Sequence, residues 1–200
     1  RYREQSVPVH IALVECSPKD SEFACPPEAA ALADIVFTVD QNLGACCRFI
    51  PPLMLPRFRW TFFGVDDHLP GRRHIECLVR CAESLDGKFA TIGQDGRCIR
   101  PDGSYVKRRA RPYPSTPRAV DVVTSSELIY TDHIAAAIEF RNIVARRFDD
   151  PSLVSEDDLI LCMALQRWVR DRYGLPHCPS YVTPACEPDE WWAEERLPAP

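Results

Sequence analysis

Apolar and β-branched residues occur along this chain in short runs, and turn-forming residues separate the runs. Short runs of this kind predict buried strands, because a helix of the same polarity is usually longer. Strands are predicted at residues 9–14, 35–39, 60–65 and 89–92, with shorter pieces at 120–124 and 128–130. Helical spacing of apolar residues predicts longer helices over residues 72–85, 132–147 and 155–173.

Proline and glycine mark the shorter elements and the loops. Pro26-Pro27-Glu28 are expected to begin a short alanine-rich helix, since proline and an acidic residue suit a first helical turn. A second short helix is expected over residues 46–55, broken by Pro51-Pro52. Residues 93–117 contain several glycines and prolines and are expected to be a loop.

Strands and helices alternate along most of the chain. Such alternation is typical of proteins in which a parallel sheet lies between two layers of helices. We therefore expect a single-domain, three-layer α/β/α fold with a mostly parallel sheet over residues 1–176. Residues 177–200 are rich in proline and acidic residues and are expected to form a C-terminal tail.

Composition narrows the classes of partner. The 200 residues suffice for one domain with a sizeable core, and the formal net charge is −5. An acidic chain argues against nucleic acid as the main partner. No run of about 18 apolar residues occurs, so no membrane span is expected. The chain begins with Arg1 rather than methionine, which indicates a processed or shortened chain, and both the Golgi lumen and the cytoplasm stay open as locations.

The chain has ten cysteines, an unusually high number for a cytosolic protein. None of them forms a Cys-x-x-Cys pair, so neither a zinc ribbon nor a redox motif is supported. Cys178 and Cys186 are expected to form a disulfide if the chain resides in an oxidising compartment.

The strand that begins at Trp60 carries the strongest chemical signal. It leads directly into Asp66-Asp67-His68. Acidic side chains beside a dry strand cost free energy unless a cation or a hydrogen-bond donor meets them. Ligands of α/β sheets gather outside the carboxyl ends of strands, so this position predicts a site for a divalent metal ion.

Four further segments extend this motif into a resemblance. The buried strand before Val65-Asp66-Asp67-His68 is similar to the strand that ends in an Asp-x-Asp motif in nucleotide-sugar glycosyltransferases of the GT-A fold, with the exostosin-like and family-2-like groups among them. The other matching segments, in the right order, are residues 40–49, 92–93, 120–126 and 155–159. His68 makes the motif an Asp-x-His variant, and the strand that comes first in such enzymes is expected before Arg1 or is absent.

The resemblance implies roles for individual residues. It implies a metal site at Asp66 and His68 for Mn²⁺ or Mg²⁺, and a single imidazole ligand favours Mn²⁺. It implies Asp157, and next Glu156, as the catalytic base. The donor-binding residues that it implies are Asp67, Arg48, Arg108 and Arg109, and the acceptor-binding residues are Ser125, Ser126 and Trp191.

Each of these motifs also has a purely structural interpretation. Asp67 and His68 can cap the turn before the following helix. Ser155 and Asp158 are close to a capping box, and Thr131 or Asp132 can cap the helix before that. The remaining alternatives are a solvated loop for the basic run at 107–111, packing of the chain end for Trp191-Trp192, and core packing for His74, Cys77 and Cys81.

The favoured hypothesis is a metal-dependent glycosyltransferase. It would move a sugar from a nucleotide-diphosphate donor to a hydroxyl group of a glycan, lipid or protein. The alternative is a non-catalytic GT-A-like domain that binds a carbohydrate or a protein, and a metal-dependent hydrolase that uses the same acidic residues is a third hypothesis.

Overall fold

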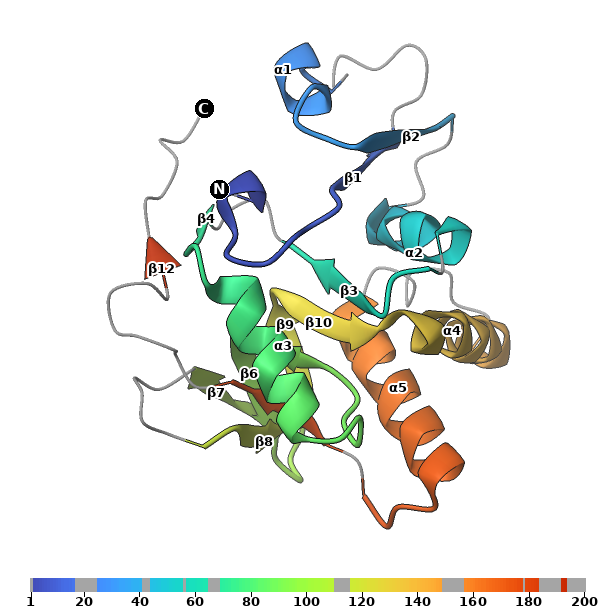
Figure 1. The fold of residues 1–200 in the computed structure, drawn as a ribbon. Coiled ribbons are helices and arrows are strands. Elements are labelled where there is room, and N and C mark those ends of the chain that lie inside the picture. Colours follow the sequence, from blue (N-terminus) through green and yellow to red (C-terminus); the bar gives the residue numbers. More distant parts are fainter. Residues whose placement is uncertain are drawn as a thin grey trace.

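The computed structural model describes residues 2–16, 25–40, 44–55, 57–64, 69–109, 116–148, 157–177, 179–183 and 192–193. Within this part the chain is a mixed α/β protein, which confirms the predicted class (Figure 1). The strands are β1 (Ala12–Cys16), β2 (Ile35–Val39), β3 (Trp60–Phe63), β4 (Leu69–Pro70), β5 (Ile92–Gly93), β6 (Asp95–Ile99), β7 (Tyr105–Arg109), β8 (Arg118–Val120), β9 (Val122–Ser125), β10 (Glu127–Tyr130), β11 (Ser180–Val182) and β12 (Trp192–Ala193). The α-helices are α1 (Pro27–Ala30), α2 (Ile50–Met54), α3 (His74–Ser84), α4 (Ile134–Phe148) and α5 (Asp157–Tyr173), and the 3₁₀ helices are η1 (Tyr2–Glu4), η2 (Gly44–Phe49) and η3 (Thr131–His133).

The strands form several sheets rather than one. The largest has the order β3-β10-β5-β11-β8, and the others are β7-β6-β9, β1-β2 and β12-β4. Among the strands that the structure describes, only β1 with β2 and β5 with β11 are parallel pairs, so the expectation of a mostly parallel sheet is wrong. The reason lies in the connections. Residues 100–104 join β6 directly to its neighbour β7, and so short a link cannot hold the crossover helix that a parallel neighbour needs.

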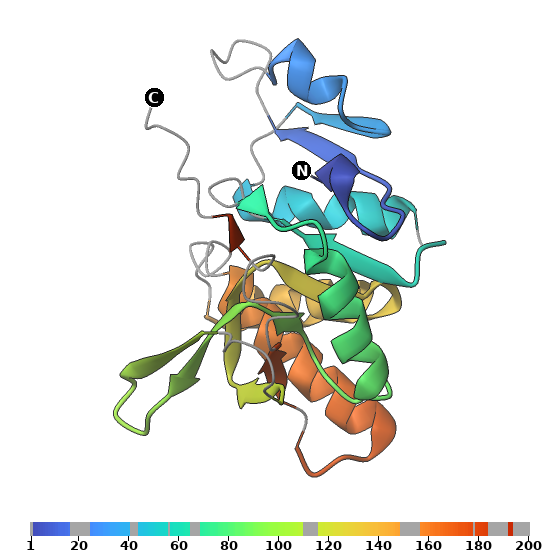
Figure 2. The ribbon, with the colours of Figure 1, turned by 60° about the vertical axis from the view of Figure 1, so that its left-hand side comes forward.

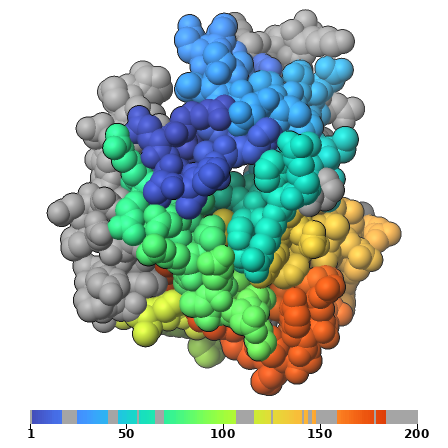
Figure 3. All heavy atoms as spheres, in the orientation of Figure 1, coloured from blue at the N-terminus to red at the C-terminus, as the bar shows by residue number. Residues whose placement is uncertain are grey.

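Helices cover both faces of the five-stranded sheet. Leu128 of β10 packs in a cluster with Leu78 and Ala82 of α3, whereas its neighbour Ile129 packs with side chains of α4 and α5. Adjacent residues of a strand point to opposite faces, so the two clusters lie on the two sides of the sheet. Figure 3 shows α3 in green and α5 in orange at the surface of one view, below the N-terminal segment in blue.

Residues 93–117, expected to be a loop, contain the hairpin of strands β6 and β7. Its turn is closed by Arg100, whose amide donates to the carbonyl of Ser104 at 2.7 Å, and Gly103 adopts a φ of +81°. The apolar pattern does not reveal the hairpin, because β6 has a glycine at a position that faces the core and β7 ends in three basic residues. A Cβ on Gly96 would come within 2.8 Å of methyl groups of Val120 and Val182, so only glycine fits where β6 crosses the sheet.

Two expectations about helix ends are also corrected. Pro51 and Pro52 do not break a helix; they begin α2, where proline lacks no needed hydrogen bond. Thr131 and Asp132 do not cap α4; they lie in the 3₁₀ turn η3, which has no side-chain cap. Gly174 ends α5 with a φ of +61°, as predicted.

The C-terminal stretch contributes to the body of the protein. Strand β11 lies between β5 and β8, where Tyr181 is opposite Ile92 on one side and Ala119 on the other. Val182 is almost completely buried. Part of the expected tail at residues 177–200 therefore belongs to the central sheet.

Candidate functional site

A buried ion pair lies at the carboxyl end of β3. Glu127, the first residue of β10, is opposite Phe63, the last residue of β3. The Glu127 side chain is 2% exposed, and its Oε2 lies 3.7 Å from Nη2 of Arg48. The guanidinium carbon of Arg48 also lies 5.0 Å from the ring centre of Phe63. The pair gives a buried carboxylate the cation that it needs at this position.

Ser125 and Ser126 are held beside this pair by the local turn of the backbone where β9 passes into β10; both strands run antiparallel to the segment that forms β5 and β6. Ser126 is buried and has a φ of +53°, a left-handed conformation that non-glycine residues rarely adopt. Such a conformation costs roughly 1–3 kcal/mol and persists only where the surroundings enforce it. The turn therefore has a fixed geometry at the point where β3 ends.

The N-terminal end of α5 points to the same turn. The Cys162 Sγ accepts a hydrogen bond from the Val123 amide at 3.3 Å, and one turn later Gln166 donates to the carbonyl of Asp121. Residues earlier in α5 thus lie beside residues later in β9. By this antiparallel relation Asp157, at the start of α5, is about one turn from Cys162 toward Ser125.

Cys162 is a structural group of this site. Burial and, after it, the negative charge of Glu127 together raise its pKa to about 12. The thiol is therefore neutral at physiological pH, and a neutral thiol is a poor nucleophile. Its hydrogen bond to Val123 and its contact with Thr91 Oγ1 at 3.6 Å tie α5 to the sheet.

Strand register brings the basic run near the same point. Asp95 of β6 is opposite Arg109 of β7 on one side and Ser125 of β9 on the other. Two strand spacings, about 10 Å, therefore separate the backbones of Arg109 and Ser125. Arg108 is opposite Gly96, one residue further along the hairpin.

The strand that follows β3 in the sequence pairs with the C-terminal stretch. Residues 69–70 form β4, which pairs with β12, so that Pro70 is opposite Trp192. The chain neighbour of Trp191 thus lies beside the residues that directly follow His68. Trp191 itself lies outside the described residues.

The described part of the chain leaves several predicted site residues untested. Asp66, Asp67, His68, Glu156 and Trp191 lie outside it, and the side chains of Ser125, Asp157, Arg108 and Arg109 are not described. Among the residues that are described, no group of three or more His, Cys, Asp and Glu side chains could hold a metal ion. The metal site at Asp66 and His68 stays a prediction.

Glu127 was missed by the sequence analysis. Its signal was present, because an acidic residue stands directly before the apolar run Leu128-Ile129-Tyr130, as Asp66 stands directly after one. The structure also gives Arg48, a predicted donor-binding residue, a partner within the protein. Its side chain remains 24% exposed beside Glu127.

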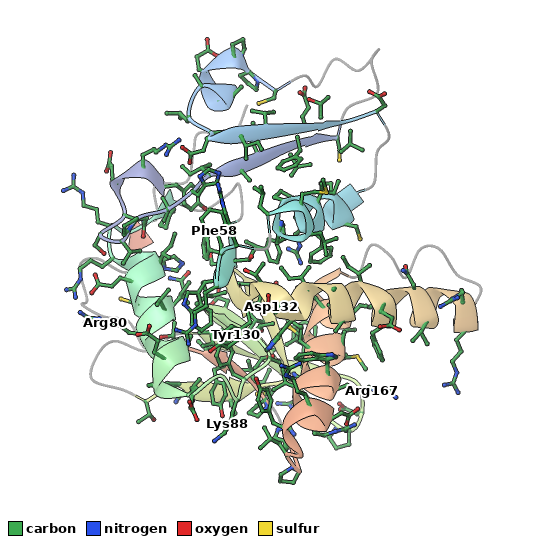
Figure 4. All side chains as sticks on the ribbon, turned by 45° about the vertical axis from the view of Figure 1, so that its right-hand side comes forward. Phe58, Arg80, Lys88, Tyr130, Asp132 and Arg167 are labelled. Carbon is green, nitrogen blue, oxygen red and sulfur yellow. The ribbon has the colours of Figure 1, made fainter. Side chains whose placement is uncertain are left out.

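The opposite end of the β3–β10 pair is closed by aromatic rings and a cation. Trp60 and Tyr130 are cross-strand partners with ring centres 4.2 Å apart, and Arg59 donates to the Tyr130 hydroxyl at 3.1 Å. Figure 4 labels Tyr130 beside the helix that carries Arg80, and its partly buried ring packs against the cluster that includes Leu78 and Ala82 of that helix. This cluster fixes the start of β3, and the Arg48–Glu127 pair fixes its end.

The residues His74, Cys77 and Cys81 share the inner face of α3, as expected for packing. All three are buried, and burial lowers the pKa of His74 to about 4. Cys77 is disulfide-bonded, and the seven other cysteines among the described residues are free thiols. The predicted pair of Cys178 and Cys186 lies outside the described residues.

No family model matches the chain, and the curated proteins contain no match to it. Of the helices described, none has the length and apolar character needed to cross a membrane. Function is therefore argued from the site alone.

Proposed function

We propose that the chain is a metal-dependent glycosyltransferase that acts on a nucleotide-diphosphate sugar. One observation carries the proposal: segments that the resemblance implies, far apart in sequence, meet at the end of β3. Arg48 and Cys162 of α5 lie beside Glu127, which directly follows Ser126, and Phe63, opposite Glu127, lies two residues before the segment at 65–68. Unrelated motifs would not be expected to gather in this way.

The proposed chemistry assigns each part a task. The donor leaves as a nucleoside diphosphate, and a bound Mn²⁺ or Mg²⁺ ion would neutralise the charge that develops on it. Asp66 and His68 would hold the ion, and Arg109, whose backbone lies two strand spacings from that of Ser125, would supply a cation for phosphate. Asp157 would take the proton of the acceptor hydroxyl, beside the turn at Ser125 and Ser126.

The Arg48–Glu127 pair has a supporting part in this proposal. It would hold the end of β3 at one position, so that residues 65–68 leave the sheet in a fixed direction. The Arg48 side chain is 24% exposed, and a guanidinium carries five N–H donors, so the proposal lets it donate to a phosphate as well as pair with Glu127. We therefore treat Arg48 as a positioning residue that can also contact the donor.

A second function is favoured by the same pair. If Glu127 neutralises the charge of Arg48, the site has one cation fewer for binding the donor. The better description is then a GT-A-like domain that binds carbohydrate without transferring it. The two functions differ in their need for metal, because a carbohydrate has no diphosphate for a divalent ion to bridge.

A thermal-shift panel of UDP- and GDP-sugars, with and without Mn²⁺, tests the proposal. We expect one nucleotide class to raise the melting temperature only when Mn²⁺ is present. Saturation at a hundredfold excess over Kd stabilises the folded state by about 2.7 kcal/mol, which is readily measured. Asp66→Asn is expected to remove the shift. Stabilisation by a free glycan without metal would favour the binding domain, and no shift with any nucleotide would contradict the transferase.

A further inference from the structure

The hairpin of β6 and β7 presents an open strand edge. In the sheet of order β7-β6-β9, strand β7 is at the border, and no strand among the described residues pairs with its outer side. Figure 2 shows the hairpin projecting from the body of the protein. An edge of this kind offers a row of backbone donors and acceptors to another chain.

The hydrogen-bond pattern shows which backbone groups face outward. The Arg100 amide donates to the Ser104 carbonyl, so the backbone groups of Ser104 face β6. The facing groups alternate along an antiparallel strand, so those of Val106 and Arg108 also face β6. On β6, the Arg97 carbonyl accepts a hydrogen bond from the Asp121 amide, so it faces away from β7. Arg97 is opposite Lys107, and the two residues therefore do not bond to each other, which agrees with this alternation. The N–H and C=O groups of residues 105, 107 and 109 therefore point away from the sheet.

Large side chains stand exposed beside this edge. Tyr105 is 56% exposed, and its cross-strand neighbour Ile99 is 48% exposed. The guanidinium carbon of Arg97 lies 4.4 Å from the centre of the Tyr105 ring and holds that ring in place. Tyrosine and arginine are the residue types that most often carry the binding energy of an interface. The exposed pair gives an added strand an apolar contact as well as backbone hydrogen bonds.

The positive charge of β7 determines which kind of segment can pair with its outer edge. Three consecutive residues of β7, Lys107 to Arg109, are cationic, although the chain as a whole has a net charge of −5. Cationic residues on an edge strand repel a second copy of the same strand, which would oppose three positive charges with three more. An acidic segment is attracted by the same charges.

We propose that the outer edge of β7 binds an acidic, extended polypeptide segment as an added strand. The strand runs from the hairpin tip at Tyr105 to Arg109, which lies two strand spacings from Ser125. One end of the bound segment would therefore lie beside the candidate site. The docking edge does not depend on the proposed transferase activity, since it needs neither metal nor nucleotide.

Fluorescence anisotropy with a labelled eight-residue peptide of alternating glutamate and valine tests the proposal. We expect this peptide to bind the full chain, and the same peptide with every backbone amide N-methylated, which keeps the charge and removes all N–H donors, to bind at least tenfold more weakly. Lys107→Pro removes one outward-facing N–H, and proline is tolerated on the open side of an edge strand. It should weaken binding at least tenfold more than Lys107→Ala, which removes the same charge and keeps the N–H.

Amide hydrogen exchange on the parent chain gives a readout that does not depend on any variant. The peptide should slow exchange at residues 105, 107 and 109 and leave residues 106 and 108 unchanged. Equal binding of the two acidic peptides, or equal affinity of Lys107→Pro and Lys107→Ala, would reduce the edge to a charged surface and overturn the proposal. Absence of binding by the glutamate–valine peptide, or protection of amides elsewhere only, would overturn it as well.

Discussion

Glu127 lies directly opposite Phe63 across the antiparallel pair of β10 and β3. This register sets the candidate site, because it places the turn at Ser125–Ser126 against the end of β3. A slip by one residue would move every side chain of β10 to the other face of the sheet. The Arg48–Glu127 pair opposes such a slip, since Glu127 would then leave its cation.

The first prediction concerns this ion pair. Arg48→Met should lower the free energy of unfolding by about 1–3 kcal/mol, because it leaves the Glu127 carboxylate buried without its cation. The double variant Arg48→Met with Glu127→Gln should recover part of the loss, and a double-mutant cycle in urea measures the coupling. A coupling energy near zero would show that the pair does not hold the end of β3.

The second prediction tests how the hairpin packs on the central sheet. Gly96→Ala should destabilise the protein by about 1–3 kcal/mol, because the new methyl group meets methyl groups of Val120 and Val182 at 2.8 Å. Gly103→Ala is the matched control, since nothing lies within 4 Å of its Cβ and only its φ of +81° opposes alanine. Its cost should be about 1 kcal/mol. Equal urea midpoints for the two variants would contradict the close packing.

Buried histidines predict a loss of stability in mild acid. Burial lowers the pKa of His74 and of His133 to about 4 from an ordinary value near 6.5. The unfolded chain therefore binds more protons than the folded one between about pH 6.5 and 4, so stability is full above this window and falls as the pH is lowered through it. Each of these two histidines should lower the free energy of unfolding by roughly 2 kcal/mol when the pH falls from 7 to 5.

A variant separates the contributions of the two histidines. His133 lies between the rings of Tyr130 and Trp168, with ring centres at 5.0 and 4.5 Å, so His133→Phe should keep the packing. The loss in free energy of unfolding between pH 7 and pH 5 should fall by about half. If the variant and the parent lose equal stability over this interval, His133 does not carry the predicted linkage.

The fourth prediction separates base from cap at the start of α5. Asp157→Asn should slow sugar transfer by roughly 10²–10⁴-fold, the usual worth of a positioned general base, with little effect on melting. Asp158→Ala should instead lower stability by about 0.5–2 kcal/mol if it caps the helix. Sugar transfer by Asp157→Asn at the parent rate would show that Asp157 is not the general base, and Glu156 would become the next candidate. Asp121 is a poor candidate for the general base, because its carboxylate already accepts a hydrogen bond from the Ile99 amide at 2.7 Å.

Local patterns predicted several elements correctly. The strand at residues 35–39 and the helix that became α3 were found because their apolar residues repeat with a clear period. The hairpin was not found, because β6 contributes Gly96 and Cys98 to the core and glycine gives no apolar signal. Close approach of backbones is a property of the folded sheet, and a run of residues does not reveal it.

Strand order and partners depend on contacts between distant segments. Strand β11 enters the sheet from about ninety residues beyond β5, and no local pattern indicates that Tyr181 lies opposite Ile92. The partner of Glu127 could not be predicted for the same reason, since its cation comes from η2. The donor-binding role of Arg48 and the acceptor-binding role of Ser126 stay predictions, and the structure adds only that Arg48 lies 3.7 Å from Glu127, the residue after Ser126.

The account rests on a metal and nucleotide site at the end of β3, and paramagnetic broadening by Mn²⁺ locates such a site directly. Amide spectra of the chain would be recorded with UDP or GDP and Mn²⁺, with Mg²⁺ as the diamagnetic reference. The account predicts that signals of Gly64, Ser126 and Glu127 broaden first, while that of Gly103 at the hairpin tip persists. Broadening centred on another part of the chain, or none at saturating nucleotide and Mn²⁺, would contradict it.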